Sequence, residues 1–492
     1  MAPPIRRSHH VTFAVLAVAI TAFTLLQSLV IPVLGVIQTK LETDQNTVTW
    51  VLTAYLLSAS VATPILGRLG DAIGKERVLV FTLGALTLGS LIAALSTSIE
   101  PLIVARVIQG LGGGVMPLAF GIIRDEFPEH KTASAVSVLA SLGAVGVGVG
   151  AIVAGPIVDV FGYHGLFWLP MVATAIAGLA AFFVIPPSPI RTAGGISWTP
   201  AFLLSAWLVC LLLGLSQGPT WGWSSPEVIG LLLAAVVLAP LWVVVETRVK
   251  VPLIDMRMMR LPAVWTTNLV ALLLGVGMYA TFGFVPRFVQ TATENGYGFG
   301  VSITESGIML LPSAVASFIL GFYAARLAHR FGSKNIVVLG CLLASVSLVM
   351  LAFMHDDKWQ IYASNLVQGV GNGLVFACMA NLIVAAVPPE QTGVASGMNA
   401  NIRTIGGAVG SALMSSIVTG YVLSNGMPGE TGYTVGFAVL AVALLGAAGA
   451  AMFIPTVSRE RLDDIEAHQE DEPVHPQLGW VAAGTIVGDK PE

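Results

Sequence analysis

The sequence predicts an all-α integral membrane protein with two six-helix bundles and two additional central helices, which makes fourteen transmembrane helices. Three observations predict this fold class: an apolar composition, a series of long apolar segments, and a pair of motifs that occurs twice. Hydrophobic residues make up 55% of the 492 residues and charged residues 10%, whereas soluble domains carry about 25% charged residues. Lipid must therefore solvate much of the surface.

Fourteen apolar segments are long enough to cross a bilayer, because a helix needs about 20 residues to span the hydrocarbon core. In chain order they are 11–37, 48–66, 78–97, 101–123, 133–157, 165–186, 199–216, 227–246, 262–288, 304–325, 335–354, 360–387, 394–422 and 433–454.

Basic residues support this number of spans, since Lys and Arg concentrate in cytoplasmic loops. With the N-terminus inside, the outside loops hold only Lys40, Arg287 and Lys358. The inside loops hold Arg68, Lys75, Arg77, Arg124, Lys131, Arg191, Arg248, Lys250, Arg257, Arg260, Arg326, Arg330 and Lys334. We therefore expect a multi-pass protein of the plasma membrane with both termini in the cytoplasm.

Two motifs recur at nearly the same spacing. Residues 67–77 read GRLGDAIGKER, and a degenerate copy, ARLAHRFGSK, occupies 325–334. Residues 106–114 read RVIQGLGGG, and 365–373 read NLVQGVGNG. A shared offset of about 258 to 259 residues indicates a duplicated helical unit, as in many secondary transporters.

The repeat and the spans together predict five parts of the chain. These are a cytoplasmic N-terminus (1–10), an N-terminal six-helix bundle (11–186), a linker with two extra transmembrane helices (187–261), a C-terminal six-helix bundle (262–454) and a disordered cytoplasmic tail (455–492).

Residues 67–77 place Asp71 among basic residues at the predicted cytoplasmic end of the second span. A carboxylate there can cap the N-terminus of a neighbouring helix and pair with an Arg in one conformation only. A plain positive-inside loop would explain the basic residues but not the order of the motif. We therefore predict a conformational latch formed by Gly67, Asp71, Gly74, Lys75 and Arg77. Its second copy has His329 in place of the acid, so we expect a one-sided latch.

Arg106 lies inside the fourth span, and Gln109 and Gly110 share its helix face. A buried Arg in lipid is costly and usually faces a cavity or a partner. The alternative is that it extends along the helix to the membrane interface.

In the second half, Asn365, Gln368 and Asn372 lie in the twelfth span and Asn399 and Arg403 in the thirteenth. The Asn and Gln residues could line a cavity, and the alternative is that they form hydrogen bonds between helices.

The predicted substrate or proton pathway comprises Gln27, Arg106, Gln109, Gly110, Asn365, Gln368, Asn399 and Arg403. Aromatic and methionine residues could also line a cavity for apolar or cationic ligands, and we assign none individually. They are Trp50, Tyr55, Trp207, Met278, Tyr279, Phe282 and Phe284. In the fifth span, Gly150, Gly155 and Pro156 predict tight packing and a bend.

No Asp or Glu lies near the middle of a predicted span. Asp159 and Glu305, both predicted on the outside, are the candidate proton sites if they are buried, and solvated interfacial acids are the alternative.

The order of residues 67–77 and the Arg-x-x-Gln-Gly sequence at 106–110 resemble the major facilitator superfamily, and the fourteen spans resemble its drug:proton antiporter group of the multidrug efflux type. The resemblance implies proton-coupled efflux of drug-like or amphipathic small molecules by alternating access. Two departures weigh against antiport. Gln27 stands where that group usually has an Asp, and 150–155 match the group's Gly-Pro-x-x-Gly-Gly element only in part. A facilitator or importer of a small metabolite, without proton antiport, is the alternative.

Other function classes lack their signatures. An enzyme would need a nucleophile, metal cluster or acid pair at catalytic spacing, and the eight histidines are scattered. A receptor would need a sizeable soluble output domain. Cys210, Cys341 and Cys378 show no paired spacing. We therefore expect no enzyme activity, metal or cofactor, no nucleic-acid partner, and a monomer that contacts small-molecule substrate, protons and the lipid bilayer.

Overall fold

The computed structural model describes residues 9–43, 45–188, 197–249, 252–388, 391–423 and 427–455. Within these ranges the regular structure is helical, apart from one isolated bridge between Val422 and Pro428. Fourteen helical segments are long and apolar enough to cross a membrane. The predicted all-α membrane fold is therefore confirmed. Most of the predicted N-terminal segment (1–8) and all but the first residue of the predicted tail (456–492) lie outside the described residues.

The first six spans are built from eight α-helices and two 3₁₀ turns. In order they are α1 (His9–Leu29), η1 (Ile31–Val33), α2 (Leu34–Lys40), α3 (Gln45–Ile73), α4 (Lys75–Leu95), α5 (Ile99–Gly110), η2 (Leu111–Gly114), α6 (Val115–Glu126), α7 (Glu129–Phe161) and α8 (Gly165–Val184). A Pro in η1 and a run of three glycines in η2 explain why the first and fourth spans are interrupted, because neither residue type favours a continuous helix.

The two extra spans are α9 (Trp198–Trp221) and α10 (Pro226–Arg248), followed by the short α11 (Met256–Met259). The last six spans are α12 (Pro262–Gln290), α13 (Ile303–Phe331), α14 (Ser333–Phe353), α15 (Lys358–Ala386), α16 (Thr392–Gly420) and α17 (Glu430–Ala451), with η3 (Thr293–Asn295) after α12. The second-half counterpart of the broken fourth span, α15, is continuous.

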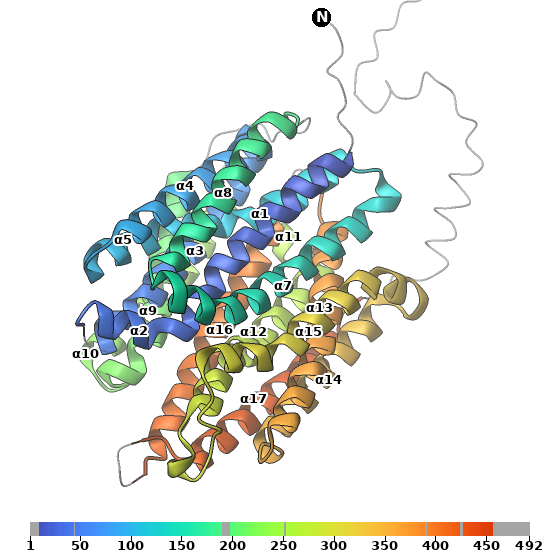
Figure 1. Cartoon of the computed structure of the whole chain (residues 1–492). Coiled ribbons are helices and arrows are strands. Elements are labelled where there is room, and N and C mark those ends of the chain that lie inside the picture. Colours follow the sequence, from blue (N-terminus) through green and yellow to red (C-terminus); the bar gives the residue numbers. More distant parts are fainter. Residues whose placement is uncertain are drawn as a thin grey trace, which may run out of the picture. The chain divides into compact units, whose positions relative to one another are not determined.

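Buried apolar side chains gather in three clusters that follow the chain order. One draws on α1–α8, one on α12–α17, and a smaller one joins α9–α11 to α16 and the end of α15. The two six-helix sets meet where α7 packs on α13 and where α3 packs on α16. Helix α9 lies beside α3 and α16, and α10 packs on α9 (Figure 1). The domain boundaries at 186/187 and 261/262 remain predictions.

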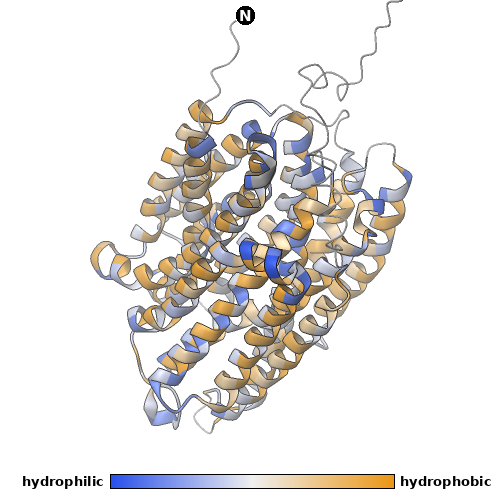
Figure 2. Cartoon of the chain, turned by 90° about the vertical axis from the view of Figure 1, so that its right-hand side faces the viewer, coloured by the Kyte–Doolittle hydropathy of each residue, from blue (hydrophilic) through white to orange (hydrophobic). Residues whose placement is uncertain are grey.

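The outer surface is apolar over most of the helix length. Figure 2 shows hydrophobic residues along the greater part of the helices in view. Phe182, Phe202 and Val236 are exposed by 67%, 71% and 69%, values that would be unfavourable in water. A hydrocarbon solvent removes this cost.

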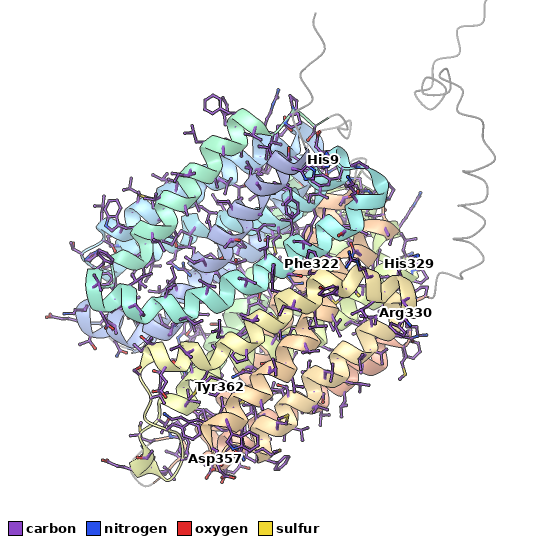
Figure 3. The ribbon with its side chains drawn as sticks, turned by 45° about the vertical axis from the view of Figure 1, so that its right-hand side comes forward. His9, Phe322, His329, Arg330, Asp357 and Tyr362 are labelled. Atoms are coloured by element: carbon purple, nitrogen blue, oxygen red, sulfur yellow. The ribbon has the colours of Figure 1, made fainter. Side chains whose placement is uncertain are left out.

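Charged side chains mark the two ends of the helices. In Figure 3, His9 at the start of α1 lies toward the same end as His329 and Arg330 in the last turn of α13, whereas Asp357 before α15 lies at the opposite end. This arrangement agrees with the predicted alternation of spans, although the orientation in a membrane remains a prediction.

The motif at 67–77 is helical rather than a loop, which corrects the predicted end of the second span. Gly67 and Asp71 lie in the last turns of α3, and only Gly74 interrupts the helix before α4 begins at Lys75. Gly74 has φ of +118°, a conformation that L-residues with a side chain avoid. The final turns of α3 pack against α16 at Gly393 and against α6 at Leu118.

Candidate functional site

A cavity of about 170 Å³ lies between the two six-helix sets. Its walls come from α1, α3, α6 and α7 of the first half, with one residue of η2, and from α12, α13, α15 and α16 of the second. These are the first, second, fourth and fifth spans of each half, so the duplicated unit lines the cavity twice. Most lining side chains are apolar or aromatic, which suits a ligand with a large apolar part.

Three of the predicted pathway residues line this cavity: Gln27, Asn399 and Arg403. The amide nitrogen of Asn399 donates to Oδ1 of Asn268 at 2.9 Å, which holds α16 against α12. The Arg403 guanidinium carbon lies 4.8 Å from the centre of the Phe376 ring, and Tyr279 is its hydrogen-bonding neighbour. The cavity therefore contains a guanidinium stacked on an aromatic face.

Arg106 is fully buried behind the cavity wall rather than in it. Its Nε donates to the Val51 carbonyl at 2.9 Å and its Nη1 to Oε1 of Gln109 at 2.8 Å. The guanidinium carbon lies 4.3 Å from the ring centre of Tyr55, and Tyr55 lines the cavity. The side chain is 0% exposed, so it does not extend to the membrane interface.

The other predicted pathway residues lie in helix contacts. Gln109 donates to Oγ of Ser90 at 3.1 Å, which links α5 to α4. Gly110 faces Ser58 so closely that a Cβ atom would collide with it. Asn365 donates to the Met309 carbonyl at 2.9 Å, and Gln368 is buried. Interhelical hydrogen bonding is thus the observed role of Gln109 and Asn365.

The predicted latch residue Asp71 reaches across to the second half. Its Oδ2 accepts from the backbone N–H of Val394, 3.3 Å away, in the first turn of α16. A carboxylate at that position satisfies a free N–H group and opposes the positive end of the helix dipole. Gly67 touches Gly393 at the same crossing, where a Cβ on Gly67 would lie 2.7 Å from the Gly393 carbonyl oxygen.

Lys75 connects the latch acid to a second carboxylate. Its Nζ lies 3.8 Å from Asp71 and 2.8 Å from Oδ2 of Asp125, and the three side chains are 1%, 0% and 2% exposed. The predicted latch pairing with an Arg is thus made by a Lys instead. Arg77 is 64% exposed and lies 3.6 Å from its neighbour Glu76.

Arg124 forms the counterpart of Asp71, and sequence reasoning missed it. Its Nη1 donates to the carbonyls of Val384 and Val387 at 2.5 and 2.8 Å and to Oγ1 of Thr392 at 2.7 Å. A cation at the last carbonyls of α15 complements that end of the helix dipole. The connection from α15 to α16 is therefore held by an acid at one helix end and a base at the other. The adjacent sequence Arg124-Asp125 was the available signal.

The second copy of the latch motif lies at an exposed helix end. His329 and Arg330 are exposed at the end of α13, and Arg330 lies over the ring of its neighbour Phe331 (Figure 3). The one-sided latch remains a prediction.

The extra helices are anchored next to the latch. Glu246 of α10 is 2% exposed, and its two carboxylate oxygens accept from Trp242 Nε1 at 3.0 Å and from the Ile254 N–H at 2.8 Å. Arg68 in the last turns of α3 interacts electrostatically with this carboxylate. One buried carboxylate thus ties α10 to the segment before α11.

The glycines of α7 allow close packing on two sides. A side chain at Gly146 or Gly150 would collide with Thr24 or Ser28 of α1, and one at Gly155 would collide with Thr304 of α13. Pro156 lies inside the helix, which is unbroken to Phe161. The packing part of the prediction therefore has a structural basis, and the bend remains a prediction.

The candidate proton sites both lie away from the cavity. Asp159 is exposed near the end of α7. Glu305 forms a partly exposed ion pair with Lys358, with 2.6 Å between Oε1 and Nζ. Their surroundings match the solvated alternative better than a buried proton site.

Among the aromatic and methionine candidates, Tyr55, Met278, Tyr279 and Phe282 line the cavity. Sequence reasoning missed several further lining residues, including Phe23, Phe120, Phe376 and Asn401. Which face of each helix lines the cavity depends on how the two halves pack together, and the sequence does not show this packing.

Comparisons with known proteins agree with this geometry. The family model described as Major Facilitator Superfamily matches residues 16–411 and 296–488. The Multidrug transporter protein MdtP of Bacillus subtilis is 27% identical over 376 residues, which cover 75% of this chain and 68% of the relative. The Tetracenomycin C resistance and export protein of Streptomyces glaucescens is 28% identical over 391 residues, which cover 78% and 71%.

A solved structure shares the fold. The crystal structure of the human organic anion transporter MFSD10 (TETRAN) aligns with a TM-score of 0.66 over 91% of this chain and 100% of the other, at 17% sequence identity.

Proposed function

We propose that this chain, which belongs to the major facilitator superfamily, exports drug-like amphipathic small molecules from the cell by proton-coupled alternating access. Family membership makes it a multi-pass membrane transporter of small molecules, and enzymes are not typical of the family. Two relatives are named as a multidrug transporter and as a resistance and export protein, and these names support efflux as its direction.

The cavity between the halves is the single observation that carries the proposal. Equivalent spans of both repeats line it, and aromatic and aliphatic side chains dominate its wall. At one end, Asp71 and Arg124 bind the α15–α16 connection and so join the two halves there. Substrate would bind in the cavity, and release of this latch would let the halves rock and expose the site at the other side.

The plasma membrane is the proposed location, with both termini in the cytoplasm and the latch at the cytoplasmic end. The abundance of basic residues in the loops at that end supports this orientation.

A facilitator or importer without proton antiport is a second candidate. The observation that favours it is the cavity lining, in which the described residues include Gln27 from the first helix and no Asp or Glu. A proton-coupled mechanism would then have to use carboxylates at the helix ends, among which the buried Asp71 and Asp125 are the ones closest to a contact between the halves.

Dye accumulation in cells separates these candidates. Cells that express the protein should accumulate less of at least one amphipathic fluorescent dye than cells with an empty vector, and a protonophore should abolish the difference. Protein-dependent equilibration that the protonophore leaves unchanged would identify a facilitator. Equal accumulation of anionic, neutral and cationic dyes in both cell types would contradict the proposal.

A further inference from the structure

The cavity holds a cation that has no acidic partner. Among its described lining residues, Arg403 is the one with a charged side chain. The guanidinium faces the Phe376 ring and Tyr279, which lower the cost of its burial but do not neutralise it. Buried charges in proteins are normally paired, so an unpaired cation in a ligand cavity implies a partner that arrives with the ligand.

The surrounding helices offer no carboxylate to fill this role. Every Asp and Glu of the lining helices lies in a terminal turn: Asp71 in α3, Asp125 and Glu126 in α6, Glu129 and Asp159 in α7, and Glu305 in α13. The helices that carry Gln27, Tyr279, Phe376 and Arg403 themselves contain no acid at all. Three of these acids, Asp71, Asp125 and Glu305, already contact basic groups.

A second cation adds to the same positive field. Arg106 lies directly behind Tyr55, with 4.3 Å between the guanidinium carbon and the ring centre, and Tyr55 forms part of the wall. Its described contacts are a carbonyl oxygen and an amide oxygen, both neutral, and its Nη2 has no hydrogen-bond partner. In a medium of low dielectric, this charge is screened less than it would be in water.

Unpartnered polar atoms accompany the cation in the wall. The hydroxyls of Ser60 and Ser396 and both side-chain polar atoms of Asn401 are buried without a hydrogen-bond partner, and all three residues line the cavity. A ligand with oxygen acceptors could satisfy the two hydroxyls and the Asn401 amide NH₂ together with the guanidinium.

From these observations we propose that the cavity selects amphipathic organic anions, with Arg403 binding the anionic group and the aromatic wall binding the apolar part. This inference rests on the proposed transport function and specifies its substrate class. A carboxylate or sulfonate would supply the missing counter-charge, since the planar guanidinium can donate two parallel hydrogen bonds to two oxygens of such a group. A cationic ligand of the same size would meet repulsion from Arg403 and find no acid in the wall.

A matched set of dansyl probes tests the choice of charge. Dansylglycine is anionic, dansylamide neutral and dansylcadaverine cationic, and all three share one fluorescent apolar group. Binding to the purified full-length protein is followed by fluorescence enhancement. We expect the wild-type protein to bind dansylglycine about tenfold or more tightly than dansylcadaverine, as one charge-assisted contact would give.

Substitutions at Arg403 show whether this residue sets the preference. Arg403→Gln should reduce dansylglycine affinity about tenfold while leaving dansylamide affinity nearly unchanged, and Arg403→Lys should restore part of the preference. Arg287→Gln is the matched control, because Arg287 also stacks on an aromatic ring, 5.4 Å from that of Phe284, but is exposed outside the cavity. Retained dansylamide binding shows that each variant is folded.

The outcomes separate the two proposals. Equal or tighter binding of dansylcadaverine by the wild-type protein, or an anion preference that Arg403→Gln leaves intact, would overturn the anion inference while transport stands. Failure of all three probes to bind would overturn both the inference and the role of this cavity in transport.

Discussion

Two residues, Asp71 and Arg106, carry the clearest chemistry at the scale of single side chains. Asp71 places a carboxylate on the N-terminal turn of a helix from the other half of the molecule. Arg106 donates hydrogen bonds to a backbone carbonyl and to Gln109, and its guanidinium stacks on Tyr55; all these contacts lie within the first half. The first residue therefore acts between the halves, and the second shapes the wall of the cavity within one half.

Asp71→Asn should lower the rate of transport and leave the amount of protein in the membrane unchanged. The amide keeps the size of the side chain but loses the charge that favours the α16 N-terminus, which is worth about 1 kcal/mol and up to about 2. The ratio of the two conformations should shift by about tenfold, measured as dye efflux normalised to protein in the membrane. Wild-type turnover in this variant would argue against a latch.

Arg106→Ala should abolish transport while the protein still reaches the membrane, because Tyr55 and Gln109 lose the group that positions them. Arg106→Lys should recover little activity, since an ammonium cannot reproduce the planar fork that reaches Val51 and Gln109. Efflux and membrane abundance are measured together. The exposed Arg287→Ala serves as the control, and full activity of Arg106→Ala would remove Arg106 from the functional set.

At the scale of helices, contacts between pairs decide which movements are possible. α3 approaches α16 at Gly67 and Gly393 because neither residue has a side chain. α10 is held to the segment before α11 through Glu246. The first contact joins the two halves and should affect their equilibrium, whereas the second lies within the extra helices and should affect stability.

Gly67→Ala should favour the conformation in which the Asp71 end is open, because the new methyl group would press on the Gly393 carbonyl. Spin labels at the exposed Lys131 and Arg330 should report a longer distance than in the wild-type protein. Gly84→Ala is the control, since no atom lies within 4 Å of a Cβ built there. An unchanged distance in Gly67→Ala would mean that this helix crossing does not restrain the halves.

Glu246→Gln should lower the thermal unfolding temperature in detergent. One amide NH₂ group would face either Trp242 Nε1–H or the Ile254 N–H, so a donor would replace an acceptor, at a cost of about 1.5 to 3 kcal/mol. Glu227→Gln makes the same exchange at an exposed position of the same helix and should change stability by less than about 0.5 kcal/mol. Equal unfolding temperatures in the two variants would refute the anchoring role of Glu246.

At the scale of the whole molecule, the sequence predicted the fold well because lipid imposes a simple rule. Each span must be long and apolar, and a duplicated unit repeats its motifs, so both features are visible in the chain. The contact of Asp71 with a helix N-terminus was also predictable from its motif. Its partner residue was not, because Val394 lies 323 residues away in the chain.

The cavity was predicted least well. Gln27, Asn399 and Arg403 were identified because polar residues are rare in apolar spans. Arg106 was identified on the same ground, yet it lies behind the wall because Tyr55 covers it. Arg124 and Asn401 were missed, since the position of a residue relative to the opposite half depends on tertiary packing that helix periodicity does not encode.

The central claim is that the two halves rock about the cavity and that the latch restrains one end. Double electron–electron resonance on two label pairs tests it most directly, in a functional background with Cys210, Cys341 and Cys378 replaced by alanine. One pair, Lys131 and Arg330, reports the Asp71 end, and the other, Val160 and Glu294, reports the opposite end; all four positions are exposed. In Asp71→Asn, the first distance should increase and the second decrease relative to the wild-type protein. Distances that stay unchanged, or that change with the same sign at both ends, would contradict alternating access controlled by this latch.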